Sequence, residues 1–230
     1  MNLTYTLLTT TLLTTLAVTP AFAAPNGGNR NGAGNGTETC TTCIAGTVDT
    51  AEAATLTFMR EEEKLARDIY HLAAERWELP LFTNIAASEQ QHMDAIAGRL
   101  TQYSLPDPIQ NDAAGVFTDQ NLSQLYSELA LRVDDSLLEA LRVGALIEEI
   151  DIEDNQNAMD ATDNLDLKNV YGHLLHGSRN HLRAFVRDIE RQGVDYTAQH
   201  LDQAIVDVIV DSPTERGGNG GGKGGNGQRR

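Results

Sequence analysis

The sequence predicts an all-α protein, a four-helix bundle with one long crossover between the second and third helices. Three observations support this prediction. Apolar residues recur at three- and four-residue steps through almost all of residues 51–212. Aromatic residues make up only 5% of the chain and β-branched runs are few, which argues against a β-sandwich or barrel. The helical segments form two closely connected pairs, and a long polar stretch separates the pairs.

The first helix pair is predicted between residues 51 and 103. Leu56, Met59 and Tyr70 lie on one apolar face of a helix over 51–77, which the Leu79-Pro80 step ends. A second helix is expected over 81–103. Because only a few residues connect the two helices, they should form an antiparallel hairpin.

The predicted bundle covers residues 51–193, and its second half also forms a pair of helices. Asp119 is expected to cap a short helix within the crossover, Ser136 the third long helix, and Asn164 the fourth, which should end near Gly193. A short C-terminal segment, 194–212, then carries a weaker pattern over 198–210 that fits a helix or a strand.

The two ends of the chain are predicted to lie outside the bundle. Residues 1–23 contain no charged residue and end in Ala-Phe-Ala, which favours a cleaved signal peptide, and hence export, over a membrane anchor. Residues 24–50 and 213–230 are rich in Gly, and the first is also rich in Asn, so we expect both to be disordered. Cys40 and Cys43 lie in the first tail, and a local disulfide, a redox dithiol and half of a metal site all fit their spacing.

The charge of the chain excludes two classes of partner. The protein has 33 acidic and 17 basic residues, a net charge of −16, and residues 51–212 hold 30 of the acidic but only 12 of the basic residues. Such a domain repels nucleic acids and anionic membrane surfaces but attracts cations. No segment after residue 23 is apolar for the roughly 20 residues that a membrane-spanning helix requires.

Each of the four long helices places a metal-competent side chain on its predicted inward face. Unpaired buried carboxylates cost several kcal/mol each, so their convergence with two imidazoles indicates a cation, and iron or manganese prefers this mixture of ligands. The spacing of Glu89 and His92 puts both on one face of the second helix. The predicted metal ligands are Glu63, Glu89, His92, Glu148, Asp151 and His181.

Several alternatives stay open at the sequence level. Glu62 competes with Glu63 for the inward position, and Glu149 competes with Glu148. At least one of the three consecutive residues Glu61, Glu62 and Glu63 is expected at the surface. The other histidines lie off the inward faces and are expected to be exposed; they are His71, His173, His176 and His200. A metal-free bundle is the remaining alternative for the whole pattern.

Four segments, residues 60–70, 84–93, 144–152 and 177–185, resemble the DUF2202 family of the ferritin-like superfamily. The resemblance covers about residues 51–193 and implies a ferritin-like four-helix bundle.

The chain is also similar to the rubrerythrins, which implies the same ligand assignments, with Asp151 as an additional carboxylate. Two departures stand out: Ser178 occupies the position of a fourth-helix Glu, and a four-Cys rubredoxin module is absent, so the electron donor is unknown. A single metal is expected nearest Glu63, Glu89 and His92, with Glu148 able to bridge.

These expectations lead to one main functional hypothesis and two alternatives. The main hypothesis is an exported protein that binds one or two iron or manganese ions and reacts with peroxide or dioxygen, with Tyr70 donating a hydrogen bond or an electron. The alternatives are metal sequestration without turnover and a metal-free interaction module. The oligomeric state, a homodimer included, is left open by the sequence.

Overall fold

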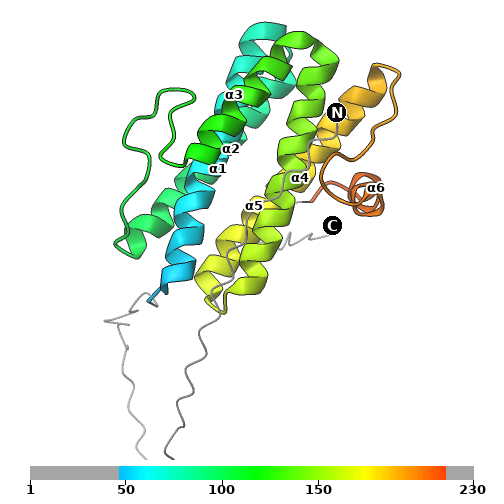
Figure 1. Cartoon of the computed structure of the whole chain (residues 1–230). Helices are drawn as coiled ribbons and strands as arrows, with labels where there is room; N and C mark the ends of the chain where they lie inside the picture. Colours follow the sequence, from blue (N-terminus) through cyan, green and yellow to red (C-terminus); the bar gives the residue numbers. More distant parts are fainter. Residues whose placement is uncertain (1–46, 216–230) are drawn as a thin grey trace, which may run out of the picture. The chain divides into compact units, whose positions relative to one another are not determined.

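The computed structural model describes residues 47–215, and all regular secondary structure in that range is helical (Figure 1). This confirms the all-α class for the described residues. The predicted signal peptide, Cys40, Cys43 and nearly all of both predicted tails lie outside the described residues. The helices are α1 (Thr50–Trp77), α2 (Pro80–Gln102), α3 (Gln120–Asp135), α4 (Leu137–Ala161), α5 (Leu165–Arg191) and α6 (Gln203–Asp211).

The helix starts follow from local capping chemistry. The side chains of Asp119, Ser136 and Asn164 accept hydrogen bonds from backbone N–H groups of the first turns of α3, α4 and α5, which confirms the three predicted caps. The cap of α1 was not predicted. Asp49 and Glu52 form a capping box there, each accepting a hydrogen bond from the other's backbone N–H.

The long helices pack as two hairpins that also contact each other. In Figure 1, α1 lies beside α2, and α4 lies beside α5. Helix α1 also packs on α4, and α2 on α5. Residues 103–136 form the predicted long crossover, in which α3 packs against α1 and α4. The short helix α6 packs against α5, so the helical alternative holds for that segment.

A layer of charged residues divides the hydrophobic core into two clusters. On α1, Met59 belongs to the smaller cluster and Leu65 to the larger, and Glu63 lies between them. On α2, Ala86 belongs to the larger cluster and Ile96 to the smaller, with the Glu89-x-x-His92 pair between them. The apolar packing on both sides therefore holds this polar layer in a water-poor environment.

The crossover covers a face of α1 that we expected to be exposed. Glu61, Glu62 and Glu63 are only 3%, 5% and 1% exposed, so the expectation that one of them lies at the surface is wrong. Glu61 accepts hydrogen bonds from the backbone N–H groups of Thr118 and Asp119 in the crossover. The crossover thus supplies hydrogen-bond donors that offset the cost of burying this carboxylate.

Ion pairs fasten the same covering segment to α1. Lys64 is fully buried, pairs with Asp68 at 2.5 Å and donates to the backbone carbonyl of Ala113. Arg67 pairs with Asp68 and with Asp112 of the crossover, at 2.8 and 2.6 Å. The result is that α1 is surrounded on all sides over residues 60–70.

Candidate metal centre

Five of the six predicted ligands form two overlapping groups between four helices. The first group is Glu63, Glu89 and His92, and the second is Glu89, Glu148 and His181. Within each group, one potential ligand atom from every residue lies within 4.8 Å of the others. Helices α1, α2, α4 and α5 each contribute at least one residue.

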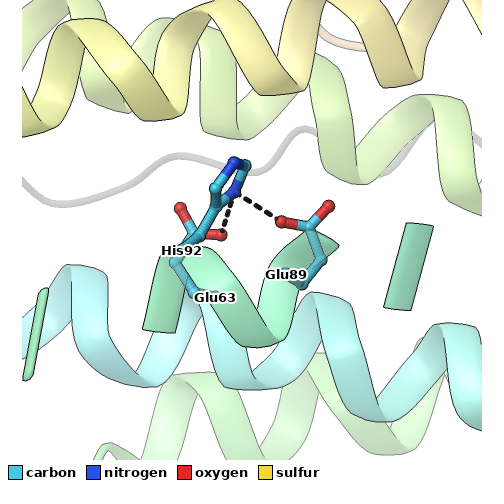
Figure 2. A group of neighbouring side chains, drawn as sticks. All are labelled: Glu63, Glu89 and His92. Carbon is cyan, nitrogen blue, oxygen red and sulfur yellow. Dashed lines mark hydrogen bonds and ion pairs between the residues drawn. The ribbon is translucent and has the colours of Figure 1, made fainter. Parts of the chain in front are cut away.

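The first group joins α1 to α2 (Figure 2). The Nδ1 atom of His92 lies 3.1 Å from Oε2 of Glu63 and 2.7 Å from Oε2 of Glu89. All three side chains are buried, with at most 3% of each exposed. The helical three-residue spacing of Glu89 and His92 brings the pair to one face, as predicted.

The second group joins α2 to α4 and α5. The Nδ1 atom of His181 lies 2.8 Å from Oε1 of Glu89 and 3.4 Å from Oε2 of Glu148. On the other edge of its ring, Nε2 of His181 lies 3.0 Å from the hydroxyl of Ser88. The hydroxyl of Tyr70 donates to Oε1 of Glu148 at 2.6 Å. Ser88 and Tyr70 therefore orient His181 and Glu148, respectively.

Glu89 is the residue shared by both groups, since one of its oxygens faces His92 and the other faces His181. This bridging position was expected for Glu148, which approaches only His181 of the two histidines. Ser178, in the place of a fourth-helix Glu, donates to the carbonyl of Leu174 in its own helix. Each group still contains two carboxylates and one imidazole, so the number of ligands does not rank the two positions.

Burial and mutual proximity shift the pKa values of the centre. Burial raises the pKa of Glu63 to about 7, although the neighbouring His92 opposes the shift. Burial raises the pKa of Glu148 as well. Burial alone would raise the pKa of Glu89 too, but His181 and His92 outweigh it, and its pKa is lowered. For His181 burial opposes protonation, yet the carboxylates of Glu89 and Glu148 raise its pKa to about 10.

The donor atoms of the centre are suited to a divalent metal. Both oxygens of Glu89, one oxygen each of Glu63 and Glu148, and Nδ1 of His181 are buried without a hydrogen-bond partner of good geometry. Polar atoms that lie this close together without forming well-aligned hydrogen bonds are unusual in a protein interior, where buried polar atoms normally have a partner. Carboxylate oxygens combined with imidazole nitrogens fit iron or manganese. The residues present therefore fit a metal.

Asp151, the sixth predicted ligand, lies outside both groups. It is 2% exposed and its Oδ2 atom has no hydrogen-bond partner. Burial and then repulsion by Glu62 and Glu63 raise its pKa well above the ordinary value. Asp151 is thus buried near the carboxylates of the centre without belonging to either group.

The structure places the adjacent glutamates differently with respect to the two groups. Glu63 and Glu148 lie in the ligand groups, whereas Glu149 turns toward the C-terminal segment. There it accepts hydrogen bonds from the backbone N–H groups of Gln199, His200 and Leu201. Helix periodicity alone cannot predict this role, because the partners lie about 50 residues further along the chain.

The remaining histidines are mostly at the surface. His71, His173 and His176 are exposed, as predicted. His200 is partly exposed, and its ring lies 2.7 Å from the carboxylate of Glu153.

Two residues that shape the centre were not predicted, namely Ser88 and Gly177. A Cβ atom built at Gly177 would collide with the imidazole of His92, so only glycine leaves that ring its present position. No pattern in the sequence distinguishes Gly177 from a helical glycine without such a contact.

Comparisons with known proteins agree on one family. Residues 52–213 match the family described as "Uncharacterized protein domain (DUF2202)". The chain is 48% identical over 161 residues to the uncharacterized protein MJ0754 of Methanocaldococcus jannaschii, covering 70% of this chain and 87% of the relative. It also matches the crystal structure of the hypothetical protein MJ0754 from Methanococcus jannaschii, with a TM-score of 0.73 and 44% identity. That match covers 76% of this chain and all of the other. The chain belongs to the DUF2202 family.

Proposed function

We propose that this protein is an exported, ferritin-like metal-binding protein that holds iron or manganese between α1, α2, α4 and α5. The observation that supports this most directly is the position of Glu89, whose two oxygens face two histidines on two different helices. A carboxylate between two imidazoles, flanked by Glu63 and Glu148, offers places for two cations that share one ligand.

A bound redox metal would supply electron transfer to peroxide or dioxygen. The chain's own residues prepare the site for this chemistry. The apolar clusters on both sides of the charged layer exclude water, and Ser88 holds the ring of His181. Tyr70, which is fully buried, holds Glu148 through its hydroxyl hydrogen and is the residue best placed to donate a hydrogen bond or an electron.

Metal content tests the first part of the proposal. The protein is loaded anaerobically with Fe(II) or Mn(II), freed of excess ion, and analysed for bound metal. One or two ions per chain are expected in the natural protein, and Glu89→Gln should lose both positions because it alters the shared ligand. The matched control is Glu153→Gln, which removes the same charge from an exposed carboxylate on α4. Sub-stoichiometric metal in the natural protein would refute the proposal.

Turnover tests the second part. Metal-loaded protein is mixed with peroxide under anaerobic conditions, and oxidant consumption is followed. Repeated consumption in the presence of a reductant supports the oxidoreductase, whereas stable binding without reaction favours metal sequestration. The unfolding midpoint with and without chelator separates both from a metal-free interaction module, because a ligand at 100 times its Kd stabilises the folded state by about 2.7 kcal/mol.

Export is tested separately. The mass of the mature protein should show removal of residues 1–23, and an intact amino terminus in material from the producing cell would contradict this part of the proposal.

A further inference from the structure

Two buried carboxylates near the centre are not explained by the ligand groups. Glu62 and Asp151 are 5% and 2% exposed, yet Oε2 of Glu62 and Oδ2 of Asp151 have no hydrogen-bond partner. Burying such groups costs several kcal/mol unless something compensates for it. No hydrogen bond among the described residues compensates these two oxygens, and a cation beside them would supply the missing partner.

These two residues connect the centre with a partly exposed third carboxylate. Glu62 on α1 lies close to Asp154 on α4, which is partly exposed and lies near Glu153 and His200. Asp151 lies close to Glu62 and to Glu63 and Glu148 of the centre, since burial and then repulsion by these carboxylates raise its pKa. Along α4, Glu148, Asp151 and Asp154 follow at three-residue steps, each a rise of about 4.5 Å. Carboxylates therefore continue from the ligand groups to the surface.

The spacing of these carboxylates suits the passage of a cation better than its tight binding. Among the described residues, only the two groups that share Glu89 bring three ligand atoms within 4.8 Å of one another. Asp154, Glu62 and Asp151 thus offer a cation one or two oxygens at a time, which replace part of its water shell without holding it firmly.

We propose that Asp154, Glu62 and Asp151 form the uptake route along which a divalent cation passes from the surface to the metal centre. The inference rests on the proposed metal-binding function. The competing path runs past exposed His173, whose ring meets that of His92 edge-on with the centroids 6.0 Å apart. A route lined by carboxylates attracts a hydrated cation more strongly than the imidazole of His173, which partial burial keeps neutral by lowering its pKa.

The test separates the rate of metal uptake from the equilibrium affinity. Metal-free protein is mixed with Co(II) in a stopped-flow instrument, and the visible absorption of the bound ion is followed. Dissociation is measured by chelator competition. Glu62→Gln and Asp154→Asn should slow uptake by about tenfold, the lower end of the gain that focused charges give. Both should slow release by a similar factor, so that Kd and stoichiometry stay unchanged. Asp160→Asn, an exposed neutralisation on the same helix, is the control and should keep the natural rate.

Each other outcome has a definite meaning. Natural uptake rates in Glu62→Gln and Asp154→Asn, or slower uptake in His173→Gln instead, would overturn the route. Faster release with a weaker Kd in Glu62→Gln would also overturn it, since Glu62 would then be a ligand. If the natural protein binds no Co(II), Fe(II) or Mn(II), the proposed function itself fails. Thermal unfolding of each metal-free variant verifies that slow uptake does not arise from a disturbed fold.

Discussion

The α-carbon of Gly177 on α5 lies against the imidazole ring of His92 on α2, so closely that a methyl group at position 177 would overlap Nε2 and Cε1 of the ring. Gly177→Ala should therefore displace His92 and weaken metal binding by at least about tenfold, in the range that loss of a supporting contact costs a metal site. Stability without metal should change little, because the gain of about 1 kcal/mol in helix propensity from alanine offsets the cost of moving the ring. Metal titration and urea unfolding measure the two effects.

Gly172→Ala provides the matched control on the same helix. A Cβ atom there would meet only the side chain of Met159, at 3.6 Å or more, which is an ordinary contact. This variant should bind metal as the natural protein does. Equal metal affinity in both alanine variants would show that the ring of His92 is free to move or is not a ligand.

The two histidines should differ in their effect on metal affinity. His92 lies 3.1 and 2.7 Å from its two carboxylates, whereas His181 lies 2.8 and 3.4 Å from its own, one of which already accepts from Tyr70. We expect His92→Ala to cost more affinity for Fe(II) or Mn(II) than His181→Ala, and more than the roughly 10–100-fold typical of outer partners. A larger loss for His181→Ala would reverse the ranking.

Tyr70→Phe should separate binding from reactivity. The change removes the hydrogen bond to Glu148 and leaves a buried carboxylate oxygen without its partner, so it should lower the free energy of unfolding by about 1.5–3 kcal/mol. Metal stoichiometry should persist, while any reaction with peroxide slows. Tyr171→Phe is the control, since the buried hydroxyl of Tyr171 has no hydrogen-bond partner and its loss should be nearly neutral. Similar destabilisation by both changes would contradict the assigned role of the Tyr70 hydroxyl.

Stability without metal should fall as the pH rises from 6 to 8. The pKa of Glu63 is raised from 4.5 to about 7, mainly by burial, so the folded protein holds a proton that the unfolded chain has already released. The pKa of His181 is raised from 6.5 to about 10 despite burial, so it also favours the folded state at low pH and loses this effect as the pH rises. Glu89, with its lowered pKa, acts only in acid and does not oppose the trend in this window.

Urea unfolding at several pH values in the presence of a chelator measures this slope. Bound metal displaces the same protons, so the loaded protein should lose less stability over the range and bind metal more tightly at pH 8. A metal-free protein that gains stability from pH 6 to 8 would contradict the assignment.

Adjacent glutamates on α4 should have opposite phenotypes. Glu149→Gln weakens the acceptor for three backbone N–H groups of residues 199–201 and should destabilise the fold by about 1.5–3 kcal/mol without changing metal affinity. Glu148→Gln should lower metal affinity instead, because Glu148 belongs to a ligand group. Calorimetric unfolding and metal titration on both variants decide the matter, and a reduced metal affinity in Glu149→Gln alone would reverse the two roles.

The sequence by itself determined the helices, most of their caps and the residues that form the two groups. Capping by Asp119, Ser136 and Asn164 depends on neighbours within a few residues, and the pairing of Glu89 with His92 depends only on the helical repeat. Such local relationships can be derived from one chain segment at a time.

Only the tertiary structure decided which partners each buried carboxylate contacts. Successive helical residues point about 100° apart, and whether each is buried depends on segments that are distant in the sequence. The crossover buries Glu61, the C-terminal segment binds Glu149, and the approach of α5 to α2 places Glu89 between two histidines. The close contact of Gly177 with His92 likewise arises between helices. Helical periodicity determines the direction of each side chain within one helix, but it does not predict which residues of a neighbouring helix or loop will contact that side chain.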